Sequence, residues 1–180
     1  MPDAALAPVI VIDLQTGMFN GVLEPPLENA DSLVPNAKAV IAWARATGRP
    51  LAFVRHDGPA GDPLAPGEPG WPVWPELGQA ADEPTFGKSV GDAFSNPTLG
   101  EWVGDAGEVV LLGAQTEYCV AATVQGALGR GLKVTVVGDA HGTWDADGET
   151  ADAIIARKNA DFEAAGASVV GVAGLTGGAR

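Results

Sequence analysis

The sequence contains little cysteine, little histidine and few basic residues. Its 180 residues include one cysteine and two histidines, and 10 lysines and arginines against 23 aspartates and glutamates give a formal net charge of −13. A single thiol excludes an internal disulfide. An acidic surface repels phosphate backbones and anionic lipids, so we expect binding neither to nucleic acid nor to a membrane surface.

Long hydrophobic runs are also missing. No apolar segment approaches the roughly 20 residues that cross a bilayer, and residues 1–12 lack the basic start of a signal peptide. We therefore expect a cytoplasmic protein. The length of 180 residues predicts a single domain over residues 1–180.

Short apolar runs rich in β-branched residues predict buried strands. They lie at residues 7–13, 50–55, 107–113, 132–138 and 167–172. Continuous apolar runs are typical of strands that are covered on both faces of a parallel sheet. Helical patterns lie between them, at residues 31–48, 117–130 and 149–165. This alternation predicts a three-layer α/β/α fold with a mostly parallel sheet.

Residues 57–85 interrupt the alternation of strands and helices. The segment holds seven prolines and five glycines, together with Trp71 and Trp74. A loop of this length inside a compact domain is usually functional.

Polar residues follow the predicted strands at their carboxyl ends, where α/β sheets bind ligands. They are Asp13, His56, the turn that carries Cys119, and Asp139 with His141. The predicted helix N-terminus at Cys119 should lower the pKa of its thiol. From position alone, Cys119 is either a nucleophile or a packing residue. Its base would be one of the two histidines or a carboxylate such as Asp13.

The chain resembles the isochorismatase-like cysteine hydrolases over nearly its whole length. This family includes nicotinamidases, N-carbamoylsarcosine amidohydrolase and ureidoacrylate amidohydrolase. The resemblance rests on three ordered segments: VIDLQTGMF (11–19), GKSVGDAFSNPTL (87–99) and LLGAQTEYCVAATVQGALGRGLKVTVVGDAHGT (111–143).

The resemblance implies a catalytic triad of Asp13, Lys88 and Cys119. In such a site, the cysteine attacks a carbonyl to form a thioester, the aspartate transfers protons, and the lysine supplies a fixed positive charge. The resemblance also implies a cis peptide between Ala114 and Gln115, with the N–H groups of Gln115 and Cys119 forming an oxyanion hole. His141 is then expected either to lie at the pocket rim or to have a structural role.

Metal binding is not expected. Metal-binding members of the family carry an Asp-x-His pair after the second strand and a further histidine downstream. Here the corresponding residues are Val54, Arg55 and His56, and the 57–85 loop contains no histidine. A lone histidine does not make a metal site, so we predict no metal, no other cofactor and no nicotinamidase activity.

The substrate pocket is expected to be a compact apolar slot for a small uncharged amide or ureido compound. Its predicted wall residues are Met18, Phe19, His56, Trp71, Trp74, Phe86 and Tyr118. Each aromatic residue could equally be core packing. Two other functions stay open: hydrolysis of a vinyl ether, as in isochorismatase itself, and a catalytically silent protein that binds a ligand or partner. Relatives commonly form homo-oligomers, and we expect the same here.

Overall fold

A parallel six-stranded sheet forms the centre of the computed structural model, which describes residues 6–21 and 25–177. The strands are β1 (Val9–Ile12), β2 (Leu51–His56), β3 (Thr85–Lys88), β4 (Glu108–Ala114), β5 (Lys133–Gly142) and β6 (Ser168–Val170). Their order is β3-β2-β1-β4-β5-β6. The chain therefore winds outward in both directions from the β1–β4 pair. The carboxyl ends of these two strands form the switch point at which such sheets bind ligands.

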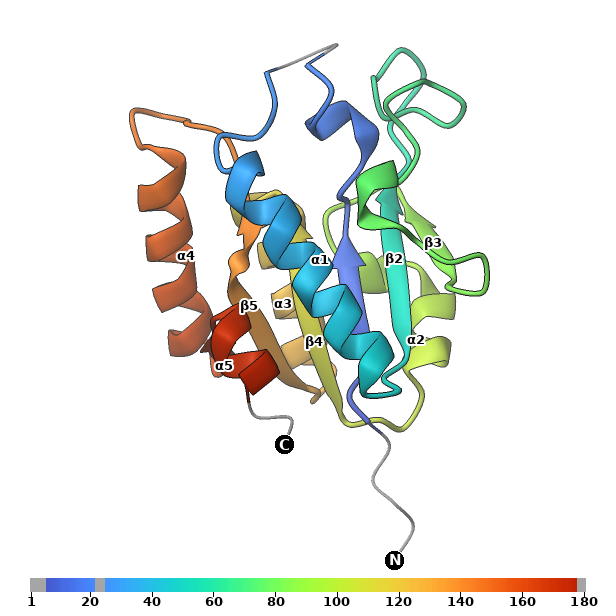
Figure 1. Ribbon diagram of the computed structural model, residues 1–180, viewed down its shortest axis with the longest axis vertical. Helices are drawn as coiled ribbons and strands as arrows, with labels where there is room; N and C mark the ends of the chain where they lie inside the picture. Colours follow the sequence, from blue (N-terminus) through green and yellow to red (C-terminus); the bar gives the residue numbers. More distant parts are fainter. Residues whose placement is uncertain (1–5, 22–24, 178–180) are drawn as a thin grey trace, which may run out of the picture.

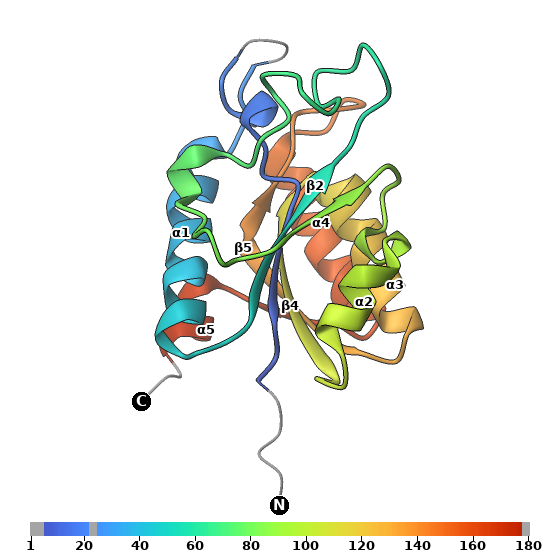
Figure 2. The same cartoon turned by 90° about the vertical axis from the view of Figure 1, so that its right-hand side faces the viewer.

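Helices cover both faces of the sheet (Figure 1, Figure 2). One face carries α1 (Ala30–Ala46) and α5 (Val172–Gly177), and the other carries α2 (Pro97–Val103), α3 (Ala121–Gly129) and α4 (Ala151–Ala164). Along β1, Val9 and Val11 pack on the α1 side, whereas Ile10 and Ile12 pack on the opposite side. This burial on both faces explains the continuous apolar runs and confirms the predicted three-layer fold. The ends of the predicted 1–180 domain lie outside the described residues.

The long segment after β2 docks on the chain that follows β1. The N–H groups of Thr16 and Gly17 donate to the carbonyls of Pro72 and Gly70, at 2.8 and 2.9 Å. A Cβ atom at Gly70 would lie 2.6 Å from the carbonyl oxygen of Pro63, so glycine permits this close approach. The loop is thereby fixed above the carboxyl ends of the strands (Figure 1).

Several element boundaries differ from the sequence prediction. The loop ends in β3, an edge strand whose residues Thr85–Lys88 lack the β-branched run of the other strands. The helix predicted at residues 31–48 spans Ala30–Ala46, and Pro35 lies inside it. Asp139 and His141 do not follow their strand but lie within β5, which runs on to Gly142 with a register shift opposite Leu111–Gly113. No helix among residues 6–21 and 25–177 is both long enough and apolar enough to cross a membrane.

Candidate active site

Asp13, Lys88 and Cys119 meet at the carboxyl ends of β1, β3 and β4. Lys88 Nζ lies 2.6 Å from Asp13 Oδ2 and 3.3 Å from Cys119 Sγ, so the ammonium donates to both. The side chains of Asp13 and Lys88 are completely buried, whereas Cys119 is half-buried. The thiol is thus the most accessible member of this cluster.

The local backbone explains how three residues from distant strands converge. Asp13 directly follows β1 and adopts a left-handed conformation with φ 49°, which breaks the alternation of the strand. Lys88 is the last residue of β3, where it pairs with His56 of β2. Cys119 lies in a five-residue π-helical turn, Thr116–Val120, between β4 and α3. The peptide bond between Ala114 and Gln115, just before this turn, is cis.

The pKa of the Cys119 thiol is raised to about 12, contrary to the fall expected from a helix N-terminus. Burial is the largest cause, the negative charge of Asp13 adds to it, and the positive charge of Lys88 opposes it. Burial also raises the pKa of Asp13, again opposed by Lys88. The physical reason is that one ammonium balances one anion, and a second anion in the same buried site is disfavoured. The resting thiol is therefore neutral beside an Asp13–Lys88 ion pair.

His56 lies at the same site because a buried glutamine holds its backbone. Gln15, which is fully buried, donates to the carbonyls of His56 and Trp71 at 3.0 and 2.8 Å and accepts from the His56 N–H at 2.9 Å. His56 Nδ1 lies 3.5 Å from Lys88 Nζ. Gln15 was not among the predicted site residues. The sequence signal for it is a polar residue at the end of the apolar VIDLQ segment, two positions after Asp13.

Asp13, His56 and Cys119 offer ligand atoms that lie within 4.8 Å of one another. The same three residues each have an atom close to Lys88 Nζ, at 2.6 Å for Asp13, 3.5 Å for His56 and 3.3 Å for Cys119. The Lys88 ammonium thus lies next to all three residues, and its positive charge would repel a dication bound there. The donor set therefore fits a metal only if Lys88 moves away.

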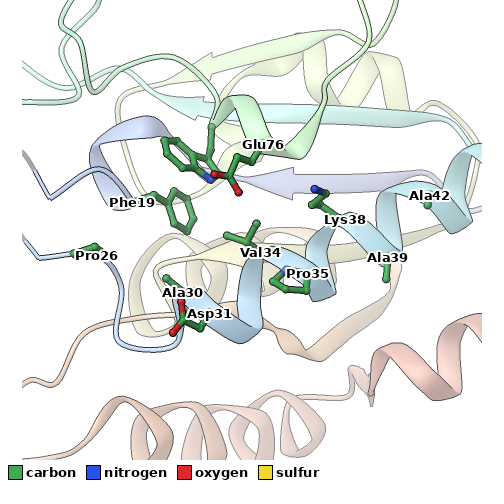
Figure 3. Close-up of a pocket in the computed structure, with 11 residues that line it drawn as sticks. Phe19, Pro26, Ala30, Asp31, Val34, Pro35, Lys38, Ala39, Ala42 and Glu76 are labelled. Atoms are coloured by element: carbon green, nitrogen blue, oxygen red, sulfur yellow. The ribbon is translucent and has the colours of Figure 1, made fainter.

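Some predicted wall residues lie on the α1 side of the molecule. Met18 and Phe19 are buried in the core under α1, and the rings of Phe19 and Trp74 stack at 5.3 Å. Phe19 and Trp74 line a groove of about 860 Å³ along α1 (Figure 3). Asp13, Lys88 and Cys119 are not among its lining residues.

The other predicted wall residues have varied surroundings. The Arg55 guanidinium covers the Trp71 ring at 3.4 Å, and the Trp71 indole donates to Asp57 at 2.7 Å. Phe86 packs against Trp102, and Tyr118 is 59% exposed. A role in substrate binding stays a prediction for all seven residues. His56 is the one that contacts Lys88 through its side chain in the described part of the chain.

His141 is not a residue of the pocket rim. It is completely buried, and both ring nitrogens have hydrogen-bond partners, Thr116 Oγ1 and Asn159 Oδ1. Of the two roles left open by the sequence, the structure supports the structural one.

Comparison with known proteins agrees with this architecture. Residues 7–170 match the family model of the isochorismatase domain. A streptothricin hydrolase of Streptomyces noursei is 34% identical over 147 residues, which cover 79% of this chain and 58% of that protein. The chain thus spans little more than half the length of this curated relative.

Solved structures show the same fold. An isochorismatase from Pseudomonas putida has a TM-score of 0.84 at 30% identity, covering 97% of this chain and 93% of that chain. A protein of Oleispira antarctica, provisionally named an isochorismatase hydrolase, has a TM-score of 0.90 at 24% identity and covers 99% of each chain. With a family model that matches most of its length, the chain belongs to the isochorismatase family.

Proposed function

We propose that this protein is a cysteine hydrolase that cleaves a C–N bond of a small amide or ureido compound through a thioester intermediate. The observation that supports it is the position of Lys88 Nζ, which contacts both Asp13 Oδ2 and Cys119 Sγ. A carboxylate that can accept a proton, a thiol that can release it and a cation that balances either anion are the groups that this chemistry requires.

The proposed reaction begins with proton transfer from Cys119 Sγ to Asp13. The site holds one negative charge before and after the transfer, so Lys88 stabilises both states. The sulfur attacks the substrate carbonyl carbon, and the N–H groups of Gln115 and Cys119 stabilise the oxyanion. Asp13 returns the proton to the leaving nitrogen as the C–N bond breaks. Water then hydrolyses the thioester, with Asp13 accepting a water proton and delivering it to the departing sulfur.

His56 is the proposed wall residue with the clearest direct support. An ammonium only donates hydrogen bonds, so Nδ1 of His56 faces Lys88 without a proton. We infer that the remaining proton is on Nε2 and that this nitrogen donates to an acceptor atom of the substrate.

A substrate panel tests the proposal. It contains primary amides, ureido compounds and streptothricin, the last because the curated relatives carry the name streptothricin hydrolase. We expect release of ammonia or amine, and a mass increase on Cys119 when the reaction is quenched early. Cys119→Ala should abolish both. Absence of turnover and of any adduct across the whole panel would contradict the proposal.

A vinyl-ether hydrolase is the second candidate. Such a reaction needs Asp13 protonated instead of paired as an anion with Lys88, and the burial that raises the pKa of this carboxyl favours the protonated form. The two functions differ in their need for the thiol. Cys119→Ala would spare vinyl-ether hydrolysis, whereas Asp13→Asn would abolish either reaction. Binding of a panel compound without turnover would instead indicate the catalytically silent protein.

A further inference from the structure

A buried chain of hydrogen bonds connects α4 with the turn that carries Cys119. Asn159 Nδ2 donates to the carbonyl of Gly138 at 2.9 Å, and Asn159 Oδ1 lies 2.8 Å from His141 Nε2. On the other side of the ring, His141 Nδ1 lies 2.9 Å from Thr116 Oγ1. Both His141 and Thr116 are completely buried.

The partners of Asn159 determine which atoms carry the protons in these hydrogen bonds. Because the amide nitrogen of Asn159 faces the Gly138 carbonyl, its oxygen faces His141, and an amide oxygen only accepts. His141 Nε2 therefore carries the proton, and Nδ1 is the acceptor. The Thr116 hydroxyl must then donate to Nδ1. All three bonds are satisfied with a neutral imidazole.

The surroundings hold the His141 ring in one orientation. The register shift of β5 sets His141 opposite Gly113, and Asn29 Nδ2 donates to the His141 carbonyl at 3.0 Å. Phe162 meets the ring edge-on at 6.0 Å between ring centres. A side chain at Gly138 would collide with Val169 and crowd Asn159, so glycine at this position leaves room for the hydrogen bonds of Asn159.

We propose that His141 is a positioning residue for the nucleophile. Thr116 is the first residue of the Thr116–Val120 turn, and Cys119 is three residues further on. By accepting from Thr116, neutral His141 ties the start of this turn to β5 and, through Asn159, to α4. His141 has no part in the proton transfers and acts on the sulfur only through the turn. The effect on catalysis rests on the proposed function. The hydrogen-bond geometry around His141 is independent of it.

The test compares Thr116→Val, which removes the hydroxyl, with Thr116→Ser, which keeps it. We expect Thr116→Val to lower kcat about five- to tenfold with little change in KM, as for loss of one buried hydrogen bond. Iodoacetamide labels the single cysteine, so its rate reports the turn without any substrate. This rate should change by a similar factor in Thr116→Val and return to the wild-type value in Thr116→Ser.

Two outcomes would overturn the inference. The first is a folded Thr116→Val protein whose kcat and labelling rate match the wild type. The second is a nitrogen NMR spectrum of the wild type that shows the His141 proton on Nδ1. This measurement needs no variant, so it tests the inference even if Thr116→Val does not fold. If the wild type hydrolyses no panel compound but the labelling rate still depends on the Thr116 hydroxyl, the proposed function fails and the positioning role stands.

Discussion

Lys88 Nζ lies 2.6 Å from Asp13 Oδ2, and both side chains are completely buried. This ion pair explains why the neighbouring thiol stays protonated, because the ammonium already balances one anion. In the proposed reaction, the nucleophile therefore forms by transfer of the thiol proton to Asp13 and is not stored as a thiolate. We expect the pair to affect both the reactivity of the thiol and the stability of the protein.

Asp13→Asn should separate thiol reactivity from turnover. The change removes the anion that raises the pKa of Cys119 and leaves the cation that lowers it. Each unit of pKa lost raises the thiolate fraction about tenfold, so iodoacetamide labelling at pH 7 should become faster. Hydrolysis should fall at least about 100-fold, because the proposed general base is gone. Asp105→Asn at an exposed position is the control, and an unchanged labelling rate in Asp13→Asn would show that Asp13 does not act on the thiol.

Lys88→Met should destabilise the protein more than removal of both partners. It leaves a buried carboxyl without its cation, a change that costs about 3 kcal/mol in comparable sites. In the double variant Asp13→Asn/Lys88→Met, no buried charge remains, so stability should largely return. Urea unfolding of the wild type, both single variants and the double variant measures this. Additive losses in the double variant would mean that the two residues are not coupled.

Lys88→Ala should create a zinc site. Removal of the ammonium leaves Asp13, His56 and Cys119, an oxygen, a nitrogen and a sulfur ligand within 4.8 Å of one another. We expect equilibrium dialysis to give about one bound zinc in the variant, and zinc to protect its cysteine from iodoacetamide. The wild type should bind none, and chelators should not change its activity. Lys88→Ala/Cys119→Ser is the control, with weaker binding expected. Equal zinc binding by wild type and Lys88→Ala would contradict the role given to Lys88.

Gly113→Ala should strongly lower the stability of the protein. Gly113 has φ 138°, and a Cβ atom there would overlap the backbone of Ile12 in the neighbouring central strand. Neither strand can withdraw without breaking the sheet, so we expect a loss of more than about 2 kcal/mol. Gly100→Ala is the matched control, because a Cβ atom at this helical position meets nothing within 4 Å. It should stabilise the protein by about 0.5–1 kcal/mol. Thermal unfolding distinguishes the two, and similar melting temperatures would refute this view of Gly113.

Stability should fall in mild acid because of His141. Burial lowers the pKa of His141 below its ordinary value of 6.5, and the opposing effects of Asn159 and Asp139 do not overcome it. Between the two pKa values, His141 therefore binds a proton in the unfolded chain but not in the folded protein. The contribution is present above pH 6.5 and is lost as the pH falls below that value.

Unfolding free energies measured from pH 7.5 to 5.0 test this effect. The slope for one proton is at most about 1.4 kcal/mol per pH unit. His141→Gln should lose this slope. His56→Gln should keep it, because His141 remains in place. A slope that survives in His141→Gln would assign the effect to other groups.

Sequence patterns determined the layers of this fold and the type of its site. Strands β1, β4 and β5 are buried on both faces, and this burial requires the continuous apolar runs that made them visible. Likewise, Asp13, Lys88 and Cys119 belong to segments whose likeness to the family is local and ordered. By contrast, β3 carries no such run: at this edge of the sheet Thr85, Phe86 and Gly87 stay exposed or partly exposed, and Lys88 alone is buried.

Tertiary structure alone decided the charge state of the thiol and the place of His141. The pKa of Cys119 depends on burial and on Asp13, which is 106 positions away in the sequence but in the same buried site. A helix N-terminus is a local feature and predicted the opposite shift. His141 became structural because a register shift in β5 turned it toward Thr116 and Asn159. Periodicity can show which residues are buried, but only long-range packing sets which charges and hydrogen-bond partners they meet there.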